Sequence, residues 1–449
     1  VLCKIGPKER RPNIGFPLFY ELIRSHGELG NWNRSLEVFN IINEPNAPCY
    51  SVTLYALSVG LLDDSSRWKH ISVLITGLTS LGSLESKSLE NAVKCCSKAN
   101  HWNEALDLLN LSKNAVGSIS VSTVNAVISA CGRNNRACEA VEIINKMKSE
   151  LNIDPNERSY RSAIMACNQA EHQNHRMVAS HHVLSARTPP EREEEDFGCD
   201  DIGMAGIGRE DLTLQWWECA LSLLRRMTEE SLLPDLQIYS SVISACGVAG
   251  KWQRAIGVLK MMEDEGRIKP NLYCINAAMS ACEKGSAWIE AVALFEQMKF
   301  NGIRPNFVTI NSLVIALDKS GQRELAENIY RKAVSTRILS HWKWNKAKNE
   351  DETVVRMMDL HQYSVSMAKI AVSHVIESML TKYPAHDITQ DLVIITGKGK
   401  YDIGVLGPLI ISILQNDFGL KEANLDDDNK GRVIVLSKDL NEFVKLRKW

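Results

Sequence analysis

The sequence predicts an α-α superhelical solenoid of helical-hairpin repeats, followed by a small α/β domain. Along residues 272–306, apolar residues recur every three or four positions on either side of a Gly-Ser break, which is typical of two amphipathic helices. The neighbouring segments 236–271 and 307–333 repeat this arrangement. Beyond residue 352 the pattern changes to short apolar strands that alternate with helices, which indicates a separate α/β domain.

Cysteine and tryptophan mark the register of the repeats. Five cysteines recur at steps of 35 or 36 residues wherever the repeats are uninterrupted: Cys96, Cys131, Cys167, Cys246 and Cys282. Because the chain has no CxxC pair, we expect these thiols to be buried at a repeated helix interface and not to form disulfides. A tryptophan opens the second helix of most units, where we expect it to fill the gap between hairpins: Trp32, Trp68, Trp102, Trp217, Trp252 and Trp288.

These markers divide residues 1–335 into about eight units, of which the first and last are degenerate. The units begin near residues 16, 52, 86, 121, 157, 236, 272 and 307. An insertion at about 171–214 contains an acidic run with scattered Gly and Pro, so we expect a disordered, solvated loop between the two helices of one hairpin. Its histidines match no zinc spacing, and we predict no metal site there.

A basic linker is expected at residues 336–351. The stretch 331–348 carries six Lys or Arg residues and no acid, with Trp342 and Trp344 between them. Two alternatives remain open for it. Positive charge beside exposed indoles suits single-stranded nucleic acid, and tryptophans in a linker equally suit packing onto the next domain.

The domain at residues 352–449 is expected to alternate strands and helices. The predicted strands cover 352–361, 391–400 and 432–437, and the predicted helices cover 364–383 and 405–419.

The overall charge excludes a uniformly basic nucleic-acid coat. The chain has 52 Lys and Arg against 54 Asp and Glu, a net charge of −2, which still allows a local basic stripe. No apolar run is long enough to span a membrane, so we expect no membrane partner. The chain begins with valine, so a targeting segment is not visible in it.

The repeats resemble pentatricopeptide repeats over residues 16–341, most strongly over 121–334. The shared features are small-residue first helices such as NAAMSACEKG, WxxA second helices, and the endings IKPN, IRPN, LLPD and IDPN. Tetratricopeptide repeats, which bind peptides, have a different pattern. The resemblance implies binding of single-stranded RNA, one base per repeat.

The resemblance places base recognition on the fifth and the last residue of a repeat. The implied pairs are Asn125/Asn156, Ser240/Asn271 and Asn276/Asn306, while Asn311 has no clear partner. The resemblance implies a pyrimidine for Asn with Asn and adenine for Ser with Asn. Arg161/Asp235 and Glu90/Ser120 fit no pair. The alternative is that these are ordinary polar residues at helix starts.

The C-terminal domain resembles the Smr domain, whose members bind nucleic acid and in some cases cleave RNA. Two motifs carry the resemblance: Asp359-Leu360-His361 after a strand, and Thr396-Gly397-Lys398-Gly399 after another. This chain departs from the family pattern at Gln362, where glycine is usual, and at Lys400-Tyr401, where histidine is frequent.

For RNA cleavage, His361 is the expected base or acid, and Asp359 would lie on the same side to orient it or to hold an ion. Thr396, Gly397 and Gly399 would bring backbone N–H groups close to a phosphate, with charge from Lys398 and Lys400. A glycine loop at this place is equally a simple tight turn.

We therefore expect an RNA-binding protein of organelle RNA metabolism, acting in transcript processing, stabilisation or translation in a plastid or mitochondrion. Binding would need no cofactor, and cleavage would use a divalent ion such as Mg²⁺. In the alternative, the C-terminal domain is not catalytic and only binds nucleic acid or a partner such as an organellar ribosome or transcription complex. A pure protein scaffold is the third hypothesis.

Overall fold

A computed structural model describes residues 15–59, 65–81, 86–113, 119–185, 215–264, 268–340, 342–346, 354–382, 388–397, 406–426 and 429–447. The chain divides into two compact units. The first contains residues 1–248 and 264–268, and the second contains 249–263 and 269–449.

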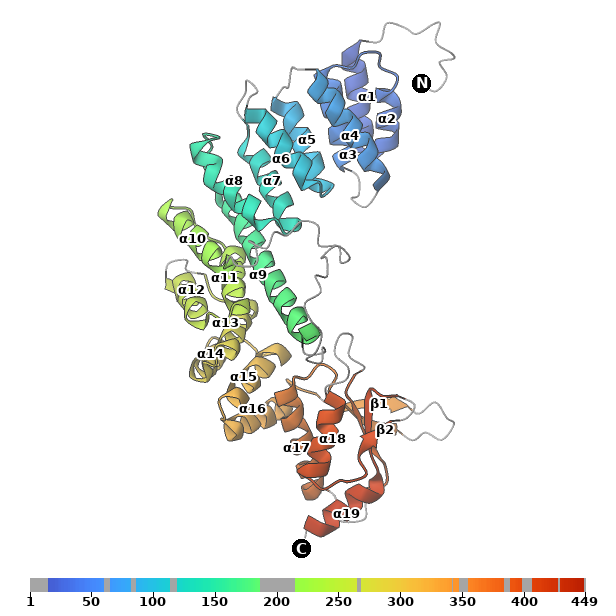
Figure 1. The fold of residues 1–449 in the computed structure, drawn as a ribbon, viewed down its shortest axis with the longest axis vertical. Coiled ribbons are helices and arrows are strands. Elements are labelled where there is room, and N and C mark those ends of the chain that lie inside the picture. The colour runs from blue at the N-terminus through green and yellow to red at the C-terminus, as the bar shows by residue number, and fades with distance from the viewer. Residues whose placement is uncertain are drawn as a thin grey trace, which may run out of the picture. The chain divides into compact units, whose positions relative to one another are not determined.

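The first unit is a series of helical hairpins (Figure 1). Its first helices, α1, α3, α5, α7, α9 and α11, pack each against the next, and α2, α4, α6, α8 and α10 each pack on the first helix of the same hairpin. The helices are α1 (Phe16–Glu28), α2 (Trp32–Phe39), α3 (Ala47–Val59), α4 (Ser65–Ser80), α5 (Ser86–Lys98), α6 (Trp102–Lys113), α7 (Val121–Arg133), α8 (Ala137–Ser149), α9 (Glu157–Ser185), α10 (Trp216–Glu229) and α11 (Leu236–Val248).

The second unit continues with helices and then contains a mixed sheet. Its helical part comprises α12 (Trp252–Asp264), α13 (Leu272–Lys284), α14 (Trp288–Phe300), α15 (Phe307–Lys319) and α16 (Arg323–Ser335). The remaining elements are β1 (Trp342–Lys346), β2 (Val354–Asp359), α17 (Val365–Lys382), β3 (Leu392–Ile395), α18 (Leu406–Asn416), β4 (Asn424–Leu425), β5 (Arg432–Val435) and α19 (Ser437–Arg447).

Where the structure describes the turn inside a hairpin, that turn contains one residue with a left-handed backbone. At Asn135 φ is 58°, and at the equivalent Ser286 it is 53°. The next residue then donates its backbone N–H to the carbonyl oxygen of the repeated cysteine, from Arg136 to Cys131 and from Ala287 to Cys282, at 2.9 Å in both cases. This arrangement satisfies carbonyl groups that the end of the first helix would otherwise leave without a partner.

The first helices begin at the residues from which the units were counted, with one exception. The second repeat begins at Ala47 and not near residue 52, because Asn46 caps α3. The Oδ1 of Asn46 accepts the backbone N–H of Cys49 at 3.2 Å. Tryptophan is the first residue of α2, α6, α12 and α14 and the second residue of α10. The exception is Trp68, which lies inside α4 because that helix begins at Ser65.

The five repeated cysteines are buried, with an exposed fraction of 0% each. They are free thiols. Burial raises the pKa of Cys131 and of Cys282 to about 12, so both thiols stay protonated at neutral pH. They therefore behave as small core residues, as the sequence indicated.

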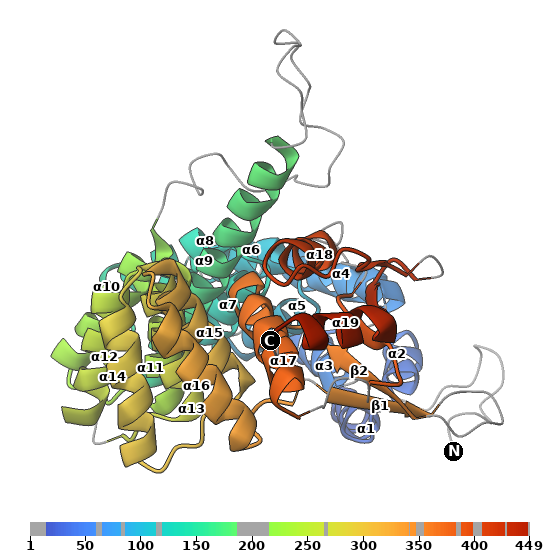
Figure 2. The same ribbon diagram turned by 90° about the horizontal axis from the view of Figure 1, so that it is seen from below.

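The prediction of a disordered loop at 171–214 is wrong for the first part of this segment. Residues 171–185 continue α9, which reaches 29 residues and projects beyond the other helices of the first unit (Figure 2). Glycine and proline are absent between Glu171 and Arg187, and the low hydrophobicity that suggested a loop does not prevent helix formation by Glu, Gln, Met, Ala and Leu. The remainder of the insertion, 186–214, lies outside the described residues.

The C-terminal sheet has the described strands in the order β1-β2-β3-β5-β4. Only β2 and β3 are parallel, joined through α17, and the other neighbours are antiparallel. The expected linker therefore contains a strand: residues 342–346 pair with residues 358–354 of β2. The sequence also gave no expectation for β4 or α19, and β2 and β3 are shorter than the apolar runs that predicted them.

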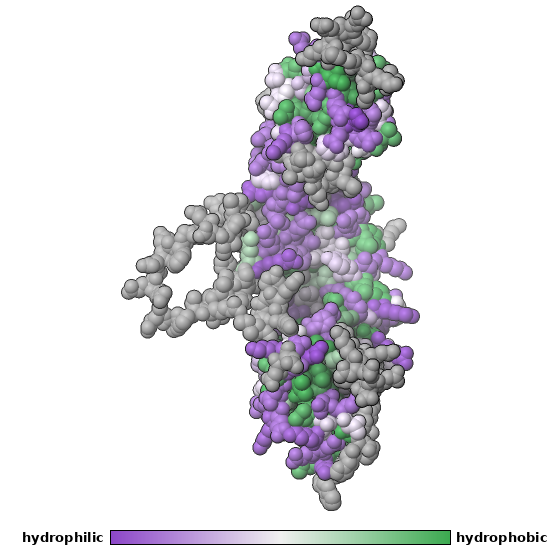
Figure 3. All heavy atoms as spheres, turned by 90° about the vertical axis from the view of Figure 1, so that its right-hand side faces the viewer, coloured by the Kyte–Doolittle hydropathy of each residue, from purple (hydrophilic) through white to green (hydrophobic). Residues whose placement is uncertain are grey.

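Hydrophilic residues cover most of the described surface on the face shown in Figure 3, and apolar residues lie in small groups between them. Within the ranges that the structure describes, no helix is long and apolar enough to cross a membrane.

Neighbouring first helices approach closely where both carry a small residue. A Cβ atom added to Gly27 of α1 would lie 2.6 Å from the Cβ of Ala56 of α3, and one added to Gly132 of α7 would lie 3.1 Å from the Cβ of Ala166 of α9. Both contacts join the twelfth residue of one first helix to the tenth residue of the next. A larger residue at these positions would force the helices apart.

We expect Gly27→Ala to lower the free energy of unfolding by about 1–3 kcal/mol, because the added methyl group overpacks the contact with Ala56. Thermal and urea unfolding followed by circular dichroism measure the change. The matched control is Gly257→Ala in α12, where nothing lies within 4 Å of the added Cβ. There the better helix propensity of alanine should stabilise the helix by up to about 1 kcal/mol. Equal effects of the two substitutions would contradict the close contact.

Candidate nucleic-acid interface

The fifth residue of α7 and the residue that precedes α9 form a hydrogen-bonded pair. Asn125 donates its Nδ2 to Oδ1 of Asn156 at 3.1 Å, and Ser159 donates its Oγ to Oδ1 of Asn125 at 2.6 Å. Asn125 is buried, with 3% of its surface exposed, whereas Asn156 is exposed. The two positions, the fifth residue of a first helix and the residue just before the next first helix, are named the pair positions below.

The same three-residue network recurs in the second unit. Asn276 donates its Nδ2 to Oδ1 of Asn306 at 3.2 Å, and Thr309 donates its Oγ1 to Oδ1 of Asn276 at 2.7 Å. Both asparagines are half-buried. The residues that the sequence placed together in these two pairs are hydrogen-bonded to each other. The sequence did not predict the hydroxyl residue that completes each network at the third position of the following helix.

The last residue of each pair also caps the next first helix. The backbone N–H of Ser159 donates to Oδ1 of Asn156 at 3.1 Å, and that of Thr309 donates to Oδ1 of Asn306 at 3.0 Å. Since a backbone N–H is only a donor, the amide oxygen must face the helix. The Nδ2 group, which is only a donor, then lies on the opposite side of each cap.

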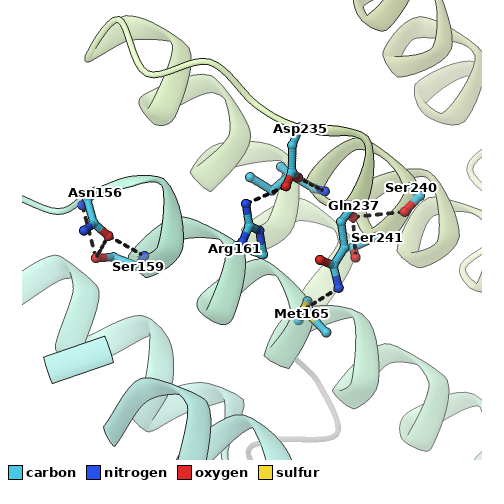
Figure 4. Close-up of polar contacts among 9 residues, drawn as sticks. Asn156, Ser159, Arg161, Met165, Asp235, Gln237, Ser240 and Ser241 are labelled. Atoms are coloured by element: carbon cyan, nitrogen blue, oxygen red, sulfur yellow. Dashed lines mark hydrogen bonds and ion pairs between the residues drawn. The ribbon is translucent and has the colours of Figure 1, made fainter. Parts of the chain in front are cut away.

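A different pair occupies these positions between α9 and α11. Arg161 donates its Nη2 to Oδ2 of Asp235 at 2.5 Å, and the backbone N–H of Ile238 donates to Oδ1 of Asp235 at 2.9 Å (Figure 4). With 32% and 40% of the two side chains exposed, this ion pair contributes at most about 1 kcal/mol to stability. Its main effect is that both oxygens of Asp235 have partners.

The other predicted pair residues are placed as follows. Ser240 is half-exposed and donates its Oγ to the backbone carbonyl of Gln237 at 3.0 Å, within α11. Asn271 is exposed and caps α13, where its Oδ1 accepts the N–H of Cys274 at 3.0 Å. These two residues belong to different compact units. The Oδ1 of Asn311 is buried and has no hydrogen-bond partner among the described residues.

A second group of predicted residues lies at the carboxyl ends of β2 and β3. His361 is bonded through Nδ1 to Oδ1 of Asp359 at 2.5 Å, and its backbone N–H donates to the same oxygen at 3.2 Å. Asp359 is buried, with 7% exposed, whereas 44% of the His361 side chain is exposed. Because an ionised carboxylate only accepts, Nδ1 is the donor of this hydrogen bond, and Nε2 is the ring nitrogen that takes no part in it.

The parallel pairing of β2 and β3 brings the second motif beside this histidine. A Cβ atom added to Gly397, where φ is +81°, would lie 3.3 Å from the Cβ of His361. Thr396 is buried, its Oγ1 has no partner among the described residues, and its backbone N–H donates to the carbonyl of Gly431 at 2.9 Å. Lys398, Gly399 and Lys400 lie outside the described residues.

The turn that carries His361 packs against the last repeat unit. The ring of Tyr363 lies 5.3 Å from that of Phe307, the residue that follows Asn306. Helix α17 packs on α15 and α16, and it lies beside them in Figure 2. Burial raises the pKa of the Tyr363 phenol to about 12, and the neighbouring Asp359 carboxylate raises it as well.

Two family models match the helical part of the chain. A model described as the PPR repeat matches residues 122–150 and 273–303, and a model described as the pentatricopeptide repeat domain matches residues 222–284. These segments are pentatricopeptide repeats. They contain Asn125 and Asn276 of the two asparagine networks, together with Asp235 and Ser240.

The chain is also similar to solved pentatricopeptide repeat structures. The crystal structure of the pentatricopeptide repeat protein PPR10 from maize is 15% identical, with a TM-score of 0.36, over 82% of this chain and 54% of that chain. A structure of PPR10 in complex with an 18-nt psaJ RNA element is 13% identical, with a TM-score of 0.28, over 80% and 58%. The chain thus spans little more than half of their length. No curated protein matches it.

Two further positions of the pentatricopeptide repeats share a helix face with the fifth residue, and sequence reasoning missed them. The second residue lies one turn before the fifth, and at this position Tyr273 is 59% exposed and Val308 is 49% exposed. The thirteenth residue lies about three turns beyond the second. It is an exposed Lys or Arg in several units, at steps of 35 that the sequence contains: Lys98, Arg133, Lys284 and Lys319.

In the part of the chain that the structure describes, no group of three or more His, Cys, Asp and Glu side chains is placed to hold a metal ion. Asp359 and His361 form a hydrogen-bonded pair.

The double role of Asn306 leads to a prediction about stability. We expect Asn306→Ala to lower the free energy of unfolding by about 1 kcal/mol, because α15 loses its capping side chain. Asn306→Asp should leave stability nearly unchanged, since a carboxylate accepts the same hydrogen bonds and favours a helix N-terminus. Urea unfolding of the full chain compares the two variants. If both variants unfold alike, Asn306 is not a cap.

Proposed function

We propose that this protein binds single-stranded RNA along its first helices and recognises individual bases through the pair positions. The observation that carries the proposal is the recurrence of one hydrogen-bonded network, Asn125–Asn156–Ser159 and Asn276–Asn306–Thr309, in both compact units. Capping a helix requires only the last residue of a repeat. The additional asparagine, which holds that residue in one orientation, has no function in capping.

The Nδ2 group of the last residue takes no part in the hydrogen bonds of either asparagine network. A fixed amide donor favours a base whose edge presents an acceptor, such as the carbonyl oxygens of uracil and cytosine. This agrees with the pyrimidine that the family resemblance implies for Asn with Asn. The half-exposed hydroxyl of Ser240 donates its hydrogen to the carbonyl of Gln237 and can still accept a hydrogen bond, and a pairing with adenine at that repeat remains part of the proposal.

The surroundings of the pair positions fit a nucleic-acid strand. Tyr273 and Val308 are exposed one turn before Asn276 and Asn311, so that a base can lie against them while an amide contacts its edge. The exposed Lys or Arg at the thirteenth position adds positive charge on the same face. This row supplies phosphate attraction that the net charge of −2 does not reveal.

We expect Asn306→Asp to change the base that the full chain prefers at one position of its RNA. The substitution replaces the outward amide donor by an acceptor while the cap is retained, so selectivity for a base with an outward acceptor should fall by about fivefold or more, as the loss of a specific contact does. Selection from a random single-stranded RNA library measures the preference. The control is Asn328→Asp, which adds the same charge at an exposed site of α16. An unchanged base preference in Asn306→Asp would refute the pair assignment.

The second proposed activity is RNA cleavage by the C-terminal domain, which we interpret as an Smr domain. The hydrogen bond between buried Asp359 and exposed His361 favours it, since the carboxylate fixes the imidazole with Nε2 available as a base. In this proposal Nε2 accepts the proton of the RNA 2′-hydroxyl as its oxygen attacks the adjacent phosphorus. The bond from that phosphorus to the 5′-oxygen of the next nucleotide breaks, and the leaving oxygen takes a proton from solvent. The proposal includes a divalent ion such as Mg²⁺ for charge stabilisation at the phosphate.

We expect His361→Ala to reduce RNA cleavage by at least about a hundredfold, because general base catalysis contributes that much or more. RNA affinity should be unchanged, since the repeats bind the strand. Cleavage of long transcripts is measured with Mg²⁺ and with a chelator, beside a Gln362→Ala control at the neighbouring exposed residue. Equal cleavage by wild-type and His361→Ala chains, or cleavage by neither, would mean that His361 is not a catalytic residue.

The biological setting that we propose is organellar RNA metabolism, in a plastid or mitochondrion, and it rests on the family resemblance. If the domain does not cleave, the adaptor hypothesis takes the place of the nuclease hypothesis. In that case the domain binds nucleic acid or a partner such as an organellar ribosome or transcription complex, while the repeats hold the transcript.

A further inference from the structure

We infer that the repeat beginning at Glu157 does not discriminate among bases, because its pair positions are occupied by an ion pair that leaves the base no selective contact. This inference rests on the proposed RNA binding. It predicts an RNA site in which a position of any base lies directly beside the position recognised by Asn125 and Asn156.

Both carboxylate oxygens of Asp235 already accept hydrogen bonds within the protein. Its Oδ1 accepts the backbone N–H of Ile238 at 2.9 Å, and its Oδ2 accepts from Arg161 at 2.5 Å (Figure 4). In the asparagine networks, by contrast, the last residue keeps an amide donor on the side opposite its cap. Asp235 therefore offers a base no amide donor at this position, whereas Asn156 and Asn306 each keep one.

Asp235 holds the Arg161 guanidinium in place. One N–H group of its Nη2 donates to Asp235, and its Nε is buried with no hydrogen-bond partner among the described residues. Arginine distinguishes guanine from other bases by two parallel hydrogen bonds to one base edge. A guanidinium held against Asp235 is not free to turn two parallel N–H groups toward a guanine edge.

Bound RNA favours the state in which the ion pair between Arg161 and Asp235 is formed. Opening it would leave the Asp235 carboxylate without its cation on a face that also receives phosphate groups, which is electrostatically unfavourable. The third position of the next helix completes the difference. It is Ile238 here, whose buried side chain has no hydrogen-bonding group, where the asparagine networks have the hydroxyl groups of Ser159 and Thr309.

The test is a selection of bound sequences from a random single-stranded RNA library, with the full chain and variants of it. Asn156→Asp and Asn306→Asp first assign positions of the selected motif to their repeats. In the wild-type chain, the position next to that of Asn156, on the side of the following repeat, should show all four bases equally. The double variant Arg161→Asn with Asp235→Asn, which leaves the net charge unchanged, should gain a preference of about fivefold for pyrimidines there.

A reciprocal variant tests the same idea without relying on a gain. Asn276→Arg with Asn306→Asp copies the ion pair into the second unit and should erase the preference at that position alone. The matched control is Arg34→Asn with Glu37→Asn, which removes an ion pair of 2.7 Å from α2 and should leave the motif unchanged. Circular dichroism verifies that each variant is folded.

The outcomes separate the inference from the proposed function. A wild-type preference for one base opposite this repeat, lost in the Arg161 and Asp235 double variant, would show that the ion pair recognises a base and would overturn the inference alone. The inference would also be overturned if the Arg161 and Asp235 double variant gained no base preference while the Asn276 and Asn306 double variant kept the wild-type preference. If no sequence is enriched, or if neither Asn156→Asp nor Asn306→Asp changes the motif, the proposed function itself fails.

Discussion

The close contact between neighbouring first helices is the constraint on which the first compact unit depends. Where α1 meets α3 and α7 meets α9, it requires a small residue at the tenth and twelfth positions, as at Ala166 and Gly132, and in α7 the buried Cys131 lies between these positions. Since the residue that ends one repeat is also the cap of the next first helix, the spacing of these helices sets the spacing of the pair positions. Regular packing in the core thereby produces a regular row of polar groups at the surface.

The capping role limits which residues can stand at the last position of a repeat. Helix caps are chosen mainly among Ser, Thr, Asp and Asn, because each presents a side-chain oxygen to a backbone N–H. The residues found here all belong to that set, and their oxygens accept such bonds: Ser120, Asn156, Asp235, Asn271 and Asn306. What differs is the group left on the other side of the cap, which is an amide in Asn and a second oxygen in Asp. The last residue of a repeat can therefore change among these capping residues, and alter the group offered to a base, while the next helix keeps its cap.

The repeats were predictable from the sequence because their period, small residues and prolines are local signals that recur. The exceptions have local causes as well: the cap at Asn46 moved one boundary, and the helix-forming residues after Glu171 extended α9 into an expected loop. The hydrogen bonds between the residues at the pair positions were not predictable in the same way. Arg161 and Asp235 are 74 residues apart, and their hydrogen bond depends on how α9 and α11 pack. The strand at 342–346 was missed because its pairing with β2 is a tertiary contact of a short basic segment.

The C-terminal sheet is not an independent body attached by a flexible linker. The segment expected to be that linker supplies β1, which pairs along the length of β2. The turn after β2 holds His361, and two residues later Tyr363 contacts Phe307, the first residue of α15. Helix α17 adds an ion pair of 3.7 Å between Glu377 and Arg331 of α16. A fragment beginning at residue 352 would lose the edge strand and expose the buried ring of Tyr363. The Asp359–His361 pair is therefore held in place partly by the last repeat unit, and its geometry belongs to the whole second unit.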